Sequence, residues 1–280
     1  MEIRQTTVEA NGLTFAALTC GDSGPLALCL HGFPDSAHTW RHLLPELAAA
    51  GYRAVAPWLR GYAPTVVPTD GDYSAATLTA DVNALHSALD GGGDAVLIGH
   101  DWGAMMTYQA GAVSPDRWRR LVTIAVPPPG IAANAFMRYE QLKRSFYIML
   151  FQTPLAELIV GADDLLFIEK LWADWSPGYD GADDLVHVKN SLRGPANLGA
   201  AIGYYRAMFA SGGGDKSPAQ PTLYLHGATD GCFAVDGIAG TEQHLSRESK
   251  VEIVDGAGHF LHVEKPTEVN KKILDWLSQG

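Results

Sequence analysis

The chain has 280 residues, of which 47% are hydrophobic and 18% are charged, a composition that supplies a large globular core. Its formal net charge of −11 argues against nucleic acid and anionic membranes as partners. No apolar run approaches the roughly 18 residues of a membrane span, and no basic-then-apolar stretch suggests a secretion signal. Cys20, Cys29 and Cys232 lack metal-like spacing. We therefore expect a cytoplasmic protein with reduced thiols.

In the first half of the chain, short apolar runs alternate with helical patterns. Residues 6–21 alternate between apolar and polar around Asn11-Gly12, which is typical of a β-hairpin. Buried strands are expected at 25–30, 52–57, 94–99 and 120–127, and helices at 39–51, 74–90 and 102–113. This alternation predicts a parallel sheet with helices on both faces.

The second half departs from this alternation before returning to it. Pro- and Gly-rich segments bound a mostly helical stretch, which predicts a helical cap over residues 128–217, with a turn at Gly212–Gly214. The core would then comprise residues 1–127 and 218–280. Its remaining elements are expected as strands at 221–227 and 250–256 and a helix at 266–278.

The stretch Gly99-His100-Asp101-Trp102-Gly103 joins an expected strand to an expected helix. A nucleophile on such a sharp turn needs small residues two positions before and two after it, because strand and helix crowd there. Gly99 and Gly103 meet this need, so Asp101 is a candidate nucleophile. The alternative is that Asp101 caps the helix, since aspartate is a good N-cap residue.

Two further segments favour the interpretation of Asp101 as a nucleophile over that as a helix cap. His31-Gly32-Phe33-Pro34 follows the strand at 25–30, and the backbone N–H groups of Phe33 and Trp102 could form an oxyanion hole. A plain turn at the end of the strand is the alternative there.

Late in the chain, Asp230 follows one strand and His259 follows the last. The order nucleophile, acid, histidine is that of an α/β-hydrolase triad, although Asp236 competes with Asp230 for the role of acid.

Five motifs, "HGFP", "LRGY", "GHDWGA", "FYIMLFQTPLAE" and "GAGHF…KP", resemble those of the epoxide hydrolases of the α/β-hydrolase fold, and the match spans essentially the whole chain. The resemblance implies a mostly parallel eight-stranded sheet with helices on both faces and an inserted helical cap. It also implies hydrolysis of a small apolar epoxide to a vicinal diol with neither a metal nor an organic cofactor, by a monomer or a homodimer.

The resemblance assigns two cap tyrosines to the epoxide oxygen. Tyr147 holds the family position four residues before the Phe-Gln of an F-Q-x-P segment, here Phe151-Gln152-Thr153-Pro154. Tyr205 holds the second position, directly before Arg206, with Tyr204 as a neighbouring alternative. Residues expected to line the substrate pocket are His31, Phe33, Pro34, Trp102 and Phe151.

In this chemistry an ionised carboxylate attacks a ring carbon, two phenols protonate the departing oxygen, and His259 with Asp230 activates water to hydrolyse the ester. "GHDWG" and "HGFP" also occur in haloalkane dehalogenases, where Trp102 and either Trp172 or Trp175 would bind the halide. The sequence supports a fluoroacetate dehalogenase less well. Its carboxylate substrate calls for arginines just after the nucleophile, where this chain has Trp102 and Met105. A hydrolase-fold binding protein without activity is the remote alternative.

Overall fold

The computed structural model describes residues 1–210 and 217–279. Eight strands form one sheet in the order β1-β2-β4-β3-β5-β6-β7-β8. β1 and β2 pair antiparallel, as do β2 and β4, and all other neighbours are parallel. This confirms the predicted fold class. The strands are β1 Arg4–Ala10, β2 Leu13–Cys20, β3 Leu26–Leu30, β4 Arg53–Pro57, β5 Ala95–His100, β6 Trp118–Ile124, β7 Thr222–Gly227 and β8 Lys250–Val254.

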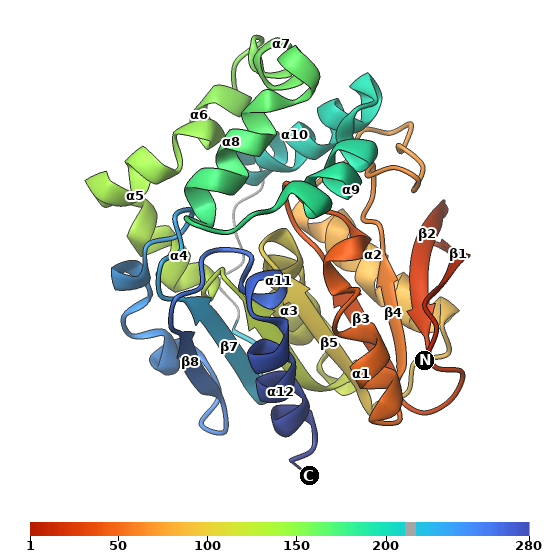
Figure 1. Ribbon diagram of the computed structural model, residues 1–280. Helices are drawn as coiled ribbons and strands as arrows, with labels where there is room; N and C mark the ends of the chain where they lie inside the picture. Colours follow the sequence, from red (N-terminus) through yellow and green to blue (C-terminus); the bar gives the residue numbers. More distant parts are fainter. Residues whose placement is uncertain (211–216, 280) are drawn as a thin grey trace.

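Helices cover both faces of the sheet, with α1 and α12 in front of it and α2 and α3 behind it in Figure 1. The strands between these layers read as continuous apolar runs because every residue of β3, β5 and β7 is buried. Ser74 precedes α2, and its hydroxyl accepts a hydrogen bond from the N–H of Thr77, as an N-cap does. The helices of the core domain are α1 Leu44–Ala49, α2 Ala75–Ala88, α3 Trp102–Val113, α11 Leu261–Glu264 and α12 Pro266–Leu277.

Two predicted elements have different bounds in the structure. The helix expected over residues 39–51 is a 3₁₀ turn at Ala37–Trp40 followed by α1, because Pro45 can occupy only the first turn of a helix. The strand expected to reach residue 127 ends at Ile124. Ala125 has a φ of 70°, which is incompatible with extended backbone.

Helices alone connect β6 to β7 within the described residues, and Figure 1 shows most of them above the upper edge of the sheet. They are α4 Pro129–Phe136, α5 Tyr139–Arg144, α6 Phe146–Phe151, α7 Ala156–Gly161, α8 Leu166–Trp175, α9 Ala182–Leu192 and α10 Pro195–Ala210. We call this segment the cap. The boundaries 128 and 217 remain predictions, and the Gly212–Gly214 turn lies outside the described residues.

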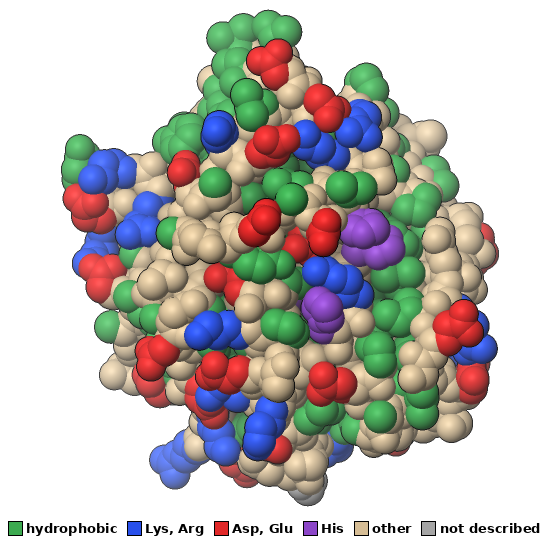
Figure 2. Space-filling model, in the orientation of Figure 1, with side chains coloured by type: hydrophobic (Ala, Val, Ile, Leu, Met, Phe, Trp, Pro, Cys, Tyr) green, Lys and Arg blue, Asp and Glu red, His purple; other side chains and the backbone are tan. Residues whose placement is uncertain are grey.

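The outer surface of the cap carries large apolar side chains. Figure 2 shows hydrophobic side chains gathered at the top of the molecule, where Figure 1 places α6 and α7. Met149, Leu155, Leu158 and Ile159 are exposed in this region. Even so, no helix in the described part of the chain is both long and apolar enough to cross a membrane.

Candidate active site

The turn between β5 and α3 holds Asp101 in a strained conformation. Its φ of 53° and ψ of −117° lie outside the ordinary regions for a residue with a side chain. Asp101 occupies the N-cap position of α3, but its side chain makes no capping hydrogen bond. The carboxylate therefore does not act as the helix cap that the sequence left as an alternative.

Glycine is required on both sides of this turn. A Cβ on Gly99 would lie 2.1 Å from the carbonyl oxygen of Gly103, and a Cβ on Gly103 would lie 2.2 Å from that of Leu30. Both distances are far below van der Waals contact. The glycines thus allow the strand and the helix to approach closely enough to present Asp101 at the carboxyl edge of the sheet.

One backbone N–H bonds to the Asp101 carboxylate, and a second lies close to it. The N–H of Phe33 donates to Asp101 Oδ1 at 2.7 Å. Trp102 is the first residue of α3, so its N–H has no acceptor within the helix. A Cβ on Gly32 would lie 2.4 Å from Asp101 Oδ1 and 2.7 Å from Trp102 N. The carboxylate oxygen and the Trp102 nitrogen therefore both lie directly beside Gly32. This arrangement suits the expected oxyanion hole.

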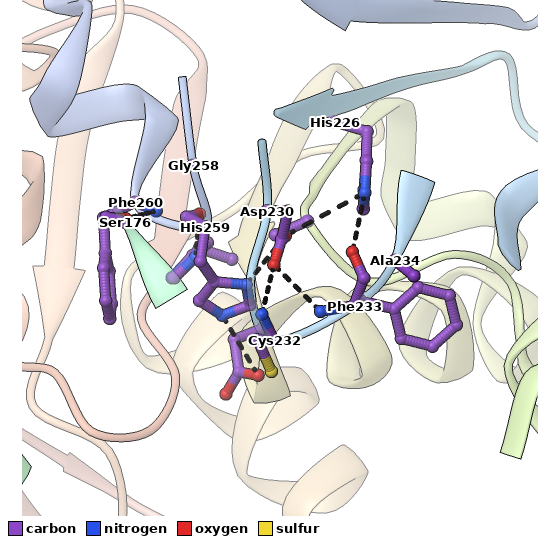
Figure 3. Close-up of polar contacts among 12 residues, drawn as sticks. Ser176, His226, Asp230, Cys232, Phe233, Ala234, Gly258, His259 and Phe260 are labelled. Carbon is purple, nitrogen blue, oxygen red and sulfur yellow. Dashed lines mark hydrogen bonds and ion pairs between the residues drawn. The ribbon is translucent and has the colours of Figure 1, made fainter. Parts of the chain in front are cut away.

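His259 lies between two carboxylates. Its Nδ1 is 2.9 Å from Asp230 Oδ2, and its Nε2 is 3.6 Å from Asp101 Oδ2. Figure 3 shows Asp230 also facing the N–H groups of Cys232 and Phe233, which donate to Oδ1 at 2.7 and 2.8 Å. Asp236 instead is exposed and pairs with Arg138, so the structure brings Asp230 and not Asp236 to His259.

The charges of these three residues stabilise one another. Burial acts to lower the pKa of His259, but Asp230 and Asp101 outweigh it and raise that pKa to about 10. Burial likewise acts to raise the pKa of Asp101, yet the imidazole of His259 and the hydrogen bond from Phe33 bring it below its ordinary value. At neutral pH the resting site therefore holds an ionised Asp101.

Asp101→Asn should lower the pKa of His259 from about 10 toward its ordinary range, because one of the two carboxylates that stabilise the imidazolium becomes neutral. NMR titration of the His259 ring measures this pKa directly, and Asp236→Asn is the matched control. The raised pKa contributes stability that is complete below about pH 6.5 and is lost as the pH rises through about 10. The wild type should therefore lose more stability than the variant between pH 7 and 10. An unchanged His259 titration would contradict this account.

Two cap tyrosines share a cavity with Asp101. Tyr147 on α6 and Tyr205 on α10 are both buried, with ring centroids 5.6 Å apart. Burial raises the pKa of both phenols well above its ordinary value, so both stay protonated and can donate. The Tyr147 hydroxyl lies 3.6 Å from Cys232 Sγ, whereas the Tyr205 hydroxyl makes no well-formed hydrogen bond among the described residues and has the side chain of Trp102 as a polar neighbour that acts to lower its pKa.

Tyr204, the neighbouring alternative, is engaged elsewhere. Its hydroxyl donates to the carbonyl oxygen of Arg60 at 2.8 Å, and its ring stacks on Tyr73. It is also absent from the residues that line the cavity at Asp101.

The cavity at Asp101 has a volume of about 60 Å³ and walls from the core and the cap. Its lining residues are Asp101, Trp102, Met105, Val126, Ala132, Phe136, Gln141, Ser145, Tyr147, Ile148, Tyr205, Met208, Cys232 and Phe233. The sequence did not indicate most of these residues, because no local pattern tells which face of a short cap helix turns toward the core.

Of the five residues expected to line the substrate pocket, Trp102 does so and the other four do not. The rings of Phe33 and Phe151 pack against Tyr205, with centroids 5.3 and 5.1 Å away. His31 Nε2 accepts a hydrogen bond from the N–H of Leu59, and burial lowers the pKa of His31 to about 4, which keeps the ring neutral. The Pro34 carbonyl accepts from the indole of Trp172. These four residues support the site from outside the cavity.

Asp35, His100 and His262 form one further buried group whose side-chain atoms could approach a metal ion. Asp35 Oδ2 lies 3.8 Å from His100 Nδ1, and the three ligand atoms lie within 4.8 Å of one another. Tetrahedral ligands at about 2.1 Å from zinc would be only about 3.4 Å apart. The ligand atoms of these three side chains therefore lie farther apart than those of a zinc site. The expectation that no metal takes part in the reaction stays a prediction.

Comparisons with known proteins identify the fold family. A family model described as the alpha/beta hydrolase fold matches residues 25–266. The AB hydrolase superfamily protein YfhM of Bacillus subtilis is 30% identical over 96% of each chain. Epoxide hydrolase 3 of Xenopus tropicalis is 31% identical over 96% of this chain and 76% of its own length. A crystal structure of Bacillus megaterium epoxide hydrolase with an inhibitor has a TM-score of 0.86 and 26% identity, covering 98% of this chain and 100% of that one.

Proposed function

The chain belongs to the α/β-hydrolase fold family, in the branch that contains the epoxide hydrolases, and we propose that it converts an epoxide into a vicinal diol through an ester on Asp101. One observation carries the proposal. An ionised carboxylate and two protonated phenols line the same small cavity, and His259 with Asp230 adjoins that carboxylate.

The first step opens the ring. An Asp101 oxygen forms a bond to a ring carbon while the bond from that carbon to the epoxide oxygen breaks. The oxygen leaves as an alkoxide, which is a poor leaving group unless it receives a proton. Tyr147 and Tyr205 hydrogen-bond this oxygen, and one of them transfers its proton. The alkyl group is then esterified to Asp101.

The second step hydrolyses the ester. Once Asp101 is esterified it carries no charge, so only Asp230 stabilises the proton on His259, the pKa of His259 falls, and this proton restores the tyrosine that protonated the alkoxide. The neutral imidazole removes a proton from water, and the resulting hydroxide attacks the carbonyl carbon of the ester. The N–H groups of Phe33 and Trp102 stabilise the oxyanion. When the bond from the carbonyl carbon to the diol oxygen breaks, that oxygen takes the remaining proton of the attacking water, and the diol departs as the Asp101 carboxylate re-forms.

Each single change Tyr147→Phe or Tyr205→Phe should slow ring opening about 100-fold, because one donor to the leaving oxygen is lost and the other remains. The double variant should lose more than about 1,000-fold, with effects that do not add, since both phenols serve one oxygen. Single-turnover rates of ester formation measure this step.

Tyr204→Phe is the control for these variants. Its hydroxyl is bonded to Arg60 and lies outside the cavity, so it should keep near wild-type rates at a cost of about 1 kcal/mol in stability. Wild-type ring opening by the double variant would refute the role of the cap tyrosines.

Dehalogenation is the second function considered, and the structure disfavours it. A departing halide needs two N–H donors, yet the indole N–H of Trp172 already donates to the Pro34 carbonyl at 2.7 Å, and Trp175 is not among the residues that line the cavity. Two assays separate the functions: diol formation from styrene oxide, and bromide release from 1-bromobutane. Diol without bromide supports the proposal, whereas bromide without diol would refute it.

A further inference from the structure

The polar side chains in the cavity wall leave few hydrogen-bonding groups free for a substrate. The amide nitrogen of Gln141 donates to Ser145 Oγ and to the Cys232 carbonyl, both at 2.9 Å. The amide oxygen of Gln141 accepts from the N–H of Ala234 at 3.1 Å. No lysine or arginine is among the lining residues. The strongest hydrogen-bonding groups that a bound molecule meets are therefore Asp101, the two phenols and the indole N–H of Trp102, all close to the reacting centre, and no charged partner lies elsewhere in the cavity wall.

One side of the reacting centre is closed by aromatic rings. Phe33 and Phe151 are both fully buried, and their ring centroids lie 5.5 Å apart. Phe151 also contacts both Tyr147 and Tyr205, with centroids 5.5 and 5.1 Å away. A substituent directed to this side would have to displace a packed aromatic cluster.

Another part of the cavity wall is apolar and less tightly packed. Met105, Phe136 and Met208 line it, and all three are only partly buried. Beyond Trp102 and Met105 lies a second cavity of about 30 Å³, lined by Ala75, Leu78, Thr79, Trp102, Met105, Met106 and Gln109. Met105 thus forms part of the wall between two cavities, and its unbranched side chain can change rotamer more readily than the Trp102 ring.

Building on the proposed function, we propose that the substrate is a terminal epoxide. One ring carbon carries a single apolar substituent without a charge, and the other ring carbon carries only hydrogen. The substituent extends toward Met105, Phe136 and Met208, while the unsubstituted side faces the cluster of Phe33 and Phe151. Met105 sets the length of chain that the cavity accepts.

The first test compares three epoxides of six carbons on the wild-type enzyme. The kcat/KM for diol formation should be at least about 10-fold higher for 1,2-epoxyhexane than for trans-2,3-epoxyhexane, since even one misplaced methylene can cost that much. It should also be at least about 10-fold higher than for 5,6-epoxyhexanoate, whose carboxylate would be buried without a partner. Equal values within either pair overturn the substrate class and leave the proposed function standing. If none of the epoxides yields diol, the proposed function fails instead.

The second test addresses Met105. Met105→Ala should join the two cavities and raise the ratio of kcat/KM for 1,2-epoxydecane over 1,2-epoxybutane by about 10-fold. Met106→Ala is the matched control, because Met106 lines only the second cavity and its removal leaves the wall intact. An unchanged ratio in Met105→Ala, or an equal rise in Met106→Ala, overturns the role of Met105. Should Met106→Ala fail to fold, Gln109→Ala serves as the control for the same cavity.

Discussion

Asp101→Asn should abolish ring opening, with a loss of at least about 10⁴-fold in the rate of ester formation. A neutral amide is a poor nucleophile, and no other carboxylate lines the cavity. The fold should persist, because asparagine has the same shape and tolerates positive φ better than most residues. Its side-chain oxygen can still accept from the N–H of Phe33.

The measurement is diol formation by freshly purified variant, with circular dichroism to confirm the fold and mass spectrometry to exclude deamidation back to aspartate. Asp236→Asn makes the same chemical change at an exposed pair with Arg138 and should keep wild-type activity. Near-normal diol formation by a verified Asp101→Asn protein would remove Asp101 from the mechanism.

The strongest sequence signals came from short segments whose backbone geometry is local. The Asp101 turn was predictable because only glycine fits at Gly99 and Gly103, where a Cβ would approach a carbonyl oxygen to about 2 Å. His259 was predictable from its glycine loop after the last strand. The choice between Asp230 and Asp236 was not, since it depends on which carboxylate accepts the N–H groups of Cys232 and Phe233 and reaches the histidine.

The walls of the cavity were largely unpredictable for a physical reason. They come from α3, α4, α5, α6 and α10 and from the loops after β6 and β7, and the orientation of each cap helix depends on how the cap packs on the core. The ring of Phe33 illustrates this point, because its backbone N–H faces Asp101 while its side chain packs on Tyr205 behind the cavity. The motif thus indicates where the backbone N–H lies, next to Asp101, but not where the side chain packs, which is outside the cavity.

Gln141 helps to fix the position of the cap relative to Asp230 and His259. Its amide bonds to Cys232 and Ala234, which lie in the loop directly after Asp230. From the next turn of the cap, Arg144 donates to the Asp230 carbonyl at 2.9 Å. Tyr147 follows one turn later and faces Cys232. The segment that presents a phenol to the substrate is therefore anchored to the loop that presents the acid to His259.

His259→Gln should form the ester on Asp101 and then stop, because glutamine cannot take a proton from water. Ring opening needs no proton removal by His259, so ester formation should continue, whereas hydrolysis should fall about 10²- to 10⁴-fold. Intact-protein mass spectrometry after mixing with styrene oxide should then show the enzyme plus one substrate. Asp101→Asn treated in the same way should gain no mass.

Labelled water distinguishes the ester route from direct attack of water on the ring. If Asp101 attacks the ring carbon, the oxygen delivered to the diol comes from the Asp101 carboxylate, and the water oxygen stays on the enzyme. In a single turnover with excess wild-type enzyme in heavy-oxygen water, the first diol should carry almost no label and the peptide containing Asp101 should gain it. Fully labelled diol with an unlabelled peptide would mean that His259 directs water onto the ring itself. Asp101, whose Oδ2 lies 3.6 Å from His259 Nε2, would then act only by stabilising the charge of the imidazolium. The mechanism through an ester would have to be abandoned.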